Sequence, residues 1–122
     1  MEKNHGNENK LNIFIAEFVG TTILSLSLNC AWTSNSIFTT VNGVTVHNPN
    51  AYFLYIMTGC CLYACFYILS PISGGHFNPA ITIAVYISLA FNSHNLLILL
   101  IFITAQLSGA FTGMLLSRGL RV

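Results

Sequence analysis

Three long apolar stretches alternate with polar segments along the 122-residue chain. They cover about residues 11–32, 51–70 and 96–116. Each is long enough to cross a hydrocarbon core of about 30 Å as a helix that rises about 1.5 Å per residue. A fourth apolar run, about Ala80 to Phe91, is too short to span. The pattern predicts an all-α membrane protein with three transmembrane helices and one shorter helix.

Charged side chains are almost confined to the two ends of the chain. Only 6% of the residues are charged against 54% hydrophobic, and Glu17 is the only charged residue between Lys10 and Arg118. Because soluble domains carry about 25% charged residues, we expect an integral, multi-pass protein in contact with membrane lipids. The basic residues form no patch for nucleic acid. Lys3 and Lys10 precede the spans and Arg118 and Arg121 follow them, so no positive-inside bias results.

Residues 1–10 form a polar N-terminal tail, which we expect to be disordered. A cleaved signal sequence is the alternative interpretation of the first apolar run. The length of that run and the presence of Glu17 inside it favour a membrane span.

The polar segment after the first run contains Asn42-Gly43, flanked by alternating threonine and valine. This dipeptide is typical of two-residue turns in β-hairpins. A flexible loop outside the membrane is the alternative.

The stretch "SGGHFNPA", residues 73–80, comes directly after the second run. Asparagine is a preferred N-cap and proline is favoured at the first helical position, so a helix is predicted to begin at Pro79. If it ends near Ser88 it is about 15 Å long, which is half a bilayer. Residues 71–90 are therefore predicted to form a re-entrant loop with a half-helix. A helix lying on the membrane surface and a plain linker are the alternatives.

The residue types at this tip suit an uncharged solute that forms hydrogen bonds. If the side-chain oxygen of Asn78 caps the helix, its NH2 group is left to donate into a cavity. The carbonyls of the preceding arm, Ser73 to His76, supply acceptors, and the two glycines permit the backbone geometry. A cation is disfavoured because the helix N-terminus carries partial positive charge.

Metal binding and catalysis find little support. The four cysteines (Cys30, Cys60, Cys61 and Cys65) could be combined with His76 into a metal cluster, but cysteines in apolar runs usually behave as small hydrophobes. The chain also lacks paired acids or a nucleophile with its base. We expect no metal, no cofactor and no enzymatic activity.

Three motifs together resemble those of the major intrinsic protein family, the aquaporins and glycerol facilitators. They are "AEFVGT" at 16–21, "SGGHFNPAIT" at 73–82 and "AQLSGA" at 105–110, and they extend the resemblance over about residues 11–117. The resemblance implies half of an inverted-repeat bundle, with three spans and one half-helix. It also implies a channel that passes water or small uncharged solutes such as glycerol.

The same resemblance implies roles for individual residues. Asn78 would donate to the permeating solute, and Glu17 and Gln106 would brace the re-entrant loop. An intramembrane carboxylate normally faces the bundle interior; a snorkelling or protonated glutamate is the alternative. Gly109 and Gly113 are expected to serve close helix packing. The remaining implied pore residues are Pro79 and Ala80 at the helix start and the carbonyls of Gly74, Gly75 and His76.

Two features depart from the family pattern. Thr58 stands where the family places an aromatic gate residue. A small hydroxyl residue there would leave a wider and more polar constriction, so a solute larger than water could pass. The chain also lacks the second half, and its C-terminal end, residues 118–122, looks truncated. Three interpretations are open: a fragment or truncated product, a dual-topology half that pairs with another copy, or a non-conducting protein that assembles with full-length relatives. A second half or an oligomer is the implied partner.

Overall fold

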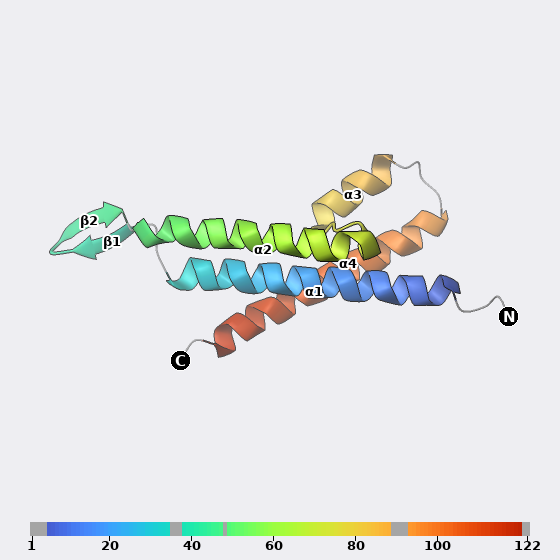
Figure 1. The fold of residues 1–122 in the computed structure, drawn as a ribbon, viewed down its shortest axis with the longest axis horizontal. Helices are drawn as coiled ribbons and strands as arrows, with labels where there is room; N and C mark the ends of the chain where they lie inside the picture. The colour runs from blue at the N-terminus through green and yellow to red at the C-terminus, as the bar shows by residue number, and fades with distance from the viewer. Residues whose placement is uncertain (1–4, 35–37, 48, 89–92, 121–122) are drawn as a thin grey trace.

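The computed structural model describes residues 5–34, 38–47, 49–88 and 93–120. Helices α1 and α2 run side by side in opposite directions, α4 crosses them obliquely, and the short α3 diverges from the bundle (Figure 1). In chain order the elements are α1 (His5–Ser34), β1 (Phe38–Val41), β2 (Val44–His47), α2 (Pro49–Ser73), α3 (Pro79–Ser88) and α4 (Ser93–Gly119).

Three of the helices are long and apolar enough to cross a membrane. The candidate spans are Asn9–Cys30 in α1, Tyr55–Ser73 in α2 and Leu96–Gly119 in α4, whereas α3 is apolar but has only 10 residues. The predicted all-α membrane fold is thereby confirmed, and the chain is an integral multi-pass membrane protein. The start of α1 and the end of α4 lie at opposite ends of the bundle, as an odd number of spans requires (Figure 1).

Helix α1 begins at His5, inside the segment that was expected to be a disordered tail. The expectation was wrong for residues 5–10. Once a helix has formed in the apolar run, each polar residue added at its end gains one backbone hydrogen bond, so the helix extends over them. Residues 1–4 of the predicted tail lie outside the described residues. So do residues 89–90 of the predicted loop and the last two residues of the C-terminal end.

Helix α2 continues past Pro71 and ends at Ser73, so the re-entrant loop starts three residues later than the predicted residue 71, and the arm one residue later than the predicted Ser73. The helix ends where Gly74 takes a positive φ of 92° and its N–H donates to the carbonyl of Ser70 at 2.8 Å. This is the usual left-handed glycine cap of a helix C-terminus. Ser73 therefore belongs to the helix, and the extended arm comprises residues 74–77.

The predicted hairpin at Asn42-Gly43 is confirmed. Strands β1 and β2 pair antiparallel, with Val41 opposite Val44. Asn42 and Gly43 both have positive φ, 52° and 78°, which is the backbone that a type I′ turn requires and that asparagine and glycine adopt most readily.

Helices α1 and α4 approach each other closely through small residues. A Cβ atom on Gly109 would lie 2.6 Å from the carbonyl oxygen of Phe18, and one on Gly113 would lie 2.5 Å from that of Thr22. The hydroxyl of Ser25 also donates to the carbonyl of Ala110 across the interface at 2.8 Å. The two glycines thus serve packing, as expected.

The arm reaches the middle of the bundle. Its last residue, Phe77, packs its ring directly on Gly20 of α1. Gly20 lies midway along the candidate span Asn9–Cys30, so the chain that leaves α2 turns back to about half the depth of the membrane before α3 begins. This geometry is that of a re-entrant loop and not of a surface helix.

Candidate pore site

The carboxylate of Glu17 holds the arm in place. Glu17 is fully buried. Its Oε1 accepts hydrogen bonds from the hydroxyl of Ser73 at 2.6 Å and from the N–H of His76 at 3.0 Å. Its Oε2 accepts from the N–H of Phe77 at 2.7 Å. The arm is neither a helix nor a strand, so the N–H groups of His76 and Phe77 have no partner from regular secondary structure. The carboxylate of Glu17 supplies the acceptor for both.

Gln106 of α4 completes this network from the other side. Its side-chain Nε2 donates to Oε2 of Glu17 at 2.9 Å and to the hydroxyl of Thr82 at 2.9 Å. Gln106 is almost fully buried. One amide group thus ties α1, α3 and α4 together, and both residues expected to brace the loop contact it or its half-helix.

The N-terminus of α3 has the cap that the sequence predicts. The side-chain Oδ1 of Asn78 accepts from the N–H of Ala80 at 2.9 Å, and the helix begins at Pro79. An N–H needs an acceptor, so the amide oxygen faces the helix and the NH2 group points away from it. A donor and the partial positive charge of the helix N-terminus therefore coincide at Asn78.

Phe77 adopts a backbone conformation that is rare for an aromatic residue. Its φ is 46°, in the left-handed region, where non-glycine residues carry strain. Two contacts hold it there: the hydrogen bond from its N–H to Glu17 and the packing of its buried ring on Gly20. The direction in which the arm enters α3 depends on both.

Gly20→Ala is expected to disturb this packing. A Cβ atom at position 20 would overlap the Phe77 ring, and overpacking of this kind costs about 1–3 kcal/mol. Gly59→Ala is the matched control, because nothing lies within 4 Å of a Cβ there and both changes bring the same gain in helix propensity. Thermal unfolding in detergent should show Gly20→Ala as the less stable variant; equal melting temperatures would contradict the contact.

A cavity of about 540 Å³ lies against the arm and the start of α3. Of the predicted site residues, Thr58, His76, Asn78, Pro79 and Gln106 line it. Ala80, Gly74 and Gly75 are not among its lining residues, and Glu17 lies buried behind the arm. The structure therefore brings the donor of Asn78 and the side chain of Thr58, twenty positions earlier, to the same space.

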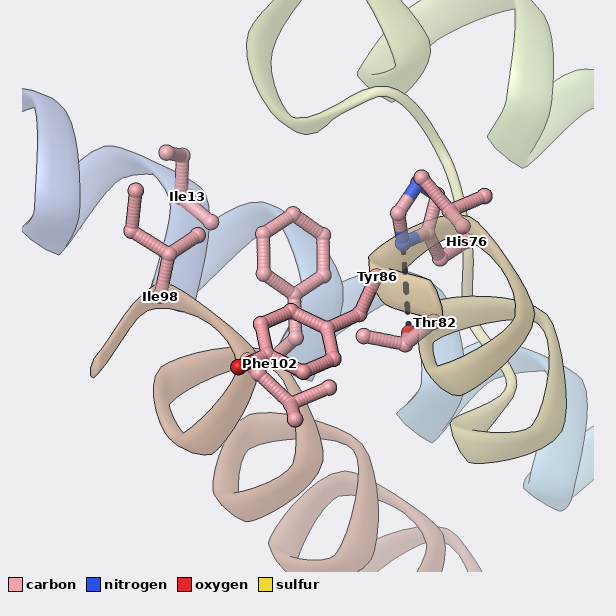
Figure 2. Close-up of a pocket in the computed structure, with 8 residues that line it drawn as sticks. Ile13, His76, Thr82, Tyr86, Ile98 and Phe102 are labelled. Atoms are coloured by element: carbon pink, nitrogen blue, oxygen red, sulfur yellow. Dashed lines mark hydrogen bonds between the residues drawn. The ribbon is translucent and has the colours of Figure 1, made fainter. Parts of the chain in front are cut away.

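His76 also lines a second cavity, of about 330 Å³, between α1, α3 and α4. Figure 2 shows the imidazole at one side of this space, with Thr82 beside it and the rings of Tyr86 and Phe102 across from it. The centroids of the His76 and Phe102 rings are 4.7 Å apart. His76 is shared by the linings of these two cavities.

Sequence reasoning missed four contributors to the site: Gly20, Phe77, Thr82 and the hydroxyl of Ser73. All four lie within the three motifs, so the motifs marked these positions as candidates. Their contacts could not be predicted, because they join residues far apart in the chain. Within the described ranges, no three histidine, cysteine or acidic side chains are grouped to hold a metal.

The fold and site define a helical membrane protein in which a re-entrant half-helix presents a donor to a cavity at mid-depth. The chain belongs to the Major intrinsic protein family, whose pattern residues 5–122 match. It is similar to Aquaporin-2 of Rhizopus delemar, with 35% identity over 101 residues. The match covers 82% of this chain and 29% of that relative, so the chain spans less than a third of its relative's length. No solved structure matches the chain.

Proposed function

We propose that the chain supplies one half of a membrane channel for water or small uncharged solutes. The observation that carries this proposal is Asn78, which caps the mid-depth half-helix and lines a cavity of about 540 Å³. Family membership and the similarity to a fungal protein named Aquaporin-2 support it.

The chemistry of this cavity favours an uncharged solute. Asn78 offers a donor, and the carbonyls of His76 and Phe77, the two arm residues in the lining, are the candidate acceptors. The N-terminus of α3 adds partial positive charge that disfavours cations. The described lining of this cavity contains no acidic or basic side chain apart from the imidazole of His76. A solute that both donates and accepts hydrogen bonds would replace its hydrogen bonds to water with hydrogen bonds to these groups, at little cost in free energy.

One half-helix supplies one arm of a path through the membrane. The 10 residues of α3 extend about 15 Å, against a hydrocarbon core of about 30 Å. We therefore propose that conduction requires a second half that carries its own half-helix, either as a fused segment or as a separate subunit.

Stopped-flow light scattering on proteoliposomes tests this function. The 122-residue chain alone should conduct neither water nor glycerol, whereas the chain fused to or co-assembled with a second half should conduct an uncharged solute and exclude protons. Asn78→Ala should reduce that flux, whereas Asn12→Ala, an exposed asparagine outside this cavity, should not.

Two outcomes would change the proposal. Rapid water flux through the purified chain alone would favour an antiparallel pair of identical halves. Absence of flux in every assembled form, with correct folding shown, would favour a non-conducting protein that acts by assembling with its relatives.

A further inference from the structure

The hydroxyl of Thr82 is a junction between three parts of the site. Thr82 is buried in the first turn of α3. Its Oγ1 lies 2.9 Å from Nε2 of Gln106, 3.1 Å from the carbonyl oxygen of Asn78 and 3.2 Å from Nδ1 of His76. Of these, only the contact to Asn78 is the ordinary i to i−4 bond of a helical threonine.

Counting protons at this hydroxyl indicates which nitrogen of His76 carries hydrogen. A hydroxyl has one hydrogen to donate and two lone pairs that accept, and Gln106 occupies one lone pair because its Nε2 can only donate. If the hydrogen goes to the carbonyl of Asn78, the second lone pair accepts from Nδ1–H of His76. All three contacts are then hydrogen bonds.

The other assignment makes one hydrogen bond fewer. If the hydroxyl donates to Nδ1 of His76, its contact with the carbonyl of Asn78 is no longer a hydrogen bond. The carbonyl oxygen of Asn78 also accepts from the backbone N–H of Thr82 at 3.1 Å, so it keeps one donor in either assignment. The assignment with the proton on Nδ1 is favoured because it makes one more hydrogen bond, and each such bond stabilises the folded state. A neutral imidazole has one N–H and one bare nitrogen, so in the neutral ring a proton on Nδ1 leaves Nε2 as an acceptor.

The Nε2 atom of His76 lies beside the arm. A Cβ atom on Gly74 would be 3.5 Å from it, and the ring is packed against Phe102. The ring thus stands between the cavity that Asn78 lines and the one drawn in Figure 2. A lone pair on Nε2 would add an acceptor at this point.

We propose that Thr82 is a positioning residue that holds His76 as a neutral imidazole with its proton on Nδ1, so that Nε2 presents an acceptor where the two cavities meet. The chemical class that this acceptor would take is an uncharged solute with an O–H or N–H donor. That last step rests on the proposed function, whereas the protonation of His76 does not.

Nitrogen-15 NMR of the full chain in lipid bilayers tests the proposal without any transport assay. The other three histidines (His5, His47 and His94) are replaced by glutamine, so that the labelled histidine signals come from His76. Wild-type Thr82 should give Nδ1–H and an unprotonated Nε2. Thr82→Val should move the proton to Nε2, the tautomer that free histidine favours, and Thr82→Ser should restore Nδ1–H.

Thr112→Val is the matched control, because that hydroxyl donates to the carbonyl of Ser108 within α4. It should leave the histidine signals unchanged. Nε2–H or a doubly protonated ring with Thr82 present would overturn the proposal, and so would a spectrum unaffected by Thr82→Val. Should the valine variant fail to fold, the wild-type and serine spectra still decide the question. A channel that fails to conduct would leave the tautomer result standing.

Discussion

Glu17→Leu is expected to destabilise the folded chain severely while improving its insertion into the membrane. The leucine would leave four donors without an acceptor. Three are buried, namely the hydroxyl of Ser73, the N–H of Phe77 and one N–H of Gln106, and the N–H of His76 is partly buried. Each unsatisfied buried donor costs about 1–3 kcal/mol, so the loss should be on the order of 4 kcal/mol or more. Insertion should improve because a charged residue at the centre of a span costs about 2.5–3.5 kcal/mol on insertion scales.

Two measurements separate these effects: the inserted fraction in a translocation assay, and the midpoint of thermal unfolding in detergent. Asn12→Leu, an exposed position on the same helix, is the control for the change in hydrophobicity and should leave the midpoint nearly unchanged. Glu17→Gln should be intermediate, because one amide oxygen can serve some of the four donors while the NH2 group faces the others. An unfolding midpoint unaffected by Glu17→Leu would refute the bracing role.

The spans and the half-helix could be predicted because their signals are local. The length of each apolar run sets whether it crosses the membrane, and Asn78-Pro79 marks a helix start by capping chemistry that involves only neighbouring residues. The hairpin at Asn42-Gly43 was predictable for the same reason. Helix ends were less predictable: α1 starts earlier than its apolar run and α2 passes through Pro71, because each end depends on the neighbouring segments of the chain as well as on the helix's own residues.

The network around the arm was only partly predictable. Family resemblance pointed to Glu17 and Gln106, but the partners of Glu17 at the end of α2 and in the arm are 56 to 60 positions away in the chain. No periodic pattern indicates that a phenylalanine takes a positive φ, because that conformation is held by tertiary contacts against its local preference. The role of Thr82 was not predictable for a related reason. The local sequence is the same whether a helical threonine bonds only to the carbonyl four residues earlier or also contacts side chains from other parts of the fold.

Thr58→Phe is expected to narrow the range of solutes toward water in the assembled channel. Thr58 lines the same cavity as Asn78 and His76, so an aromatic ring there would occupy space through which a solute must pass. Water occupies about 30 Å³, and glycerol, with six heavy atoms, is several times larger. We expect glycerol flux to fall at least about tenfold, equivalent to about 1.4 kcal/mol in the barrier, while water flux falls much less.

Stopped-flow measurements of water and glycerol flux on the same proteoliposomes give the ratio that decides this prediction. Met57→Phe is the matched control, because it introduces the same ring one position away at an exposed side chain that does not line the cavity. Thr58→Ser keeps a small hydroxyl and should preserve the wild-type ratio. If Thr58→Phe lowers both fluxes equally, the ring blocks or unfolds the channel without selecting. If it changes neither flux, the path does not pass Thr58, and the cavity shared with Asn78 is not the route of the solute.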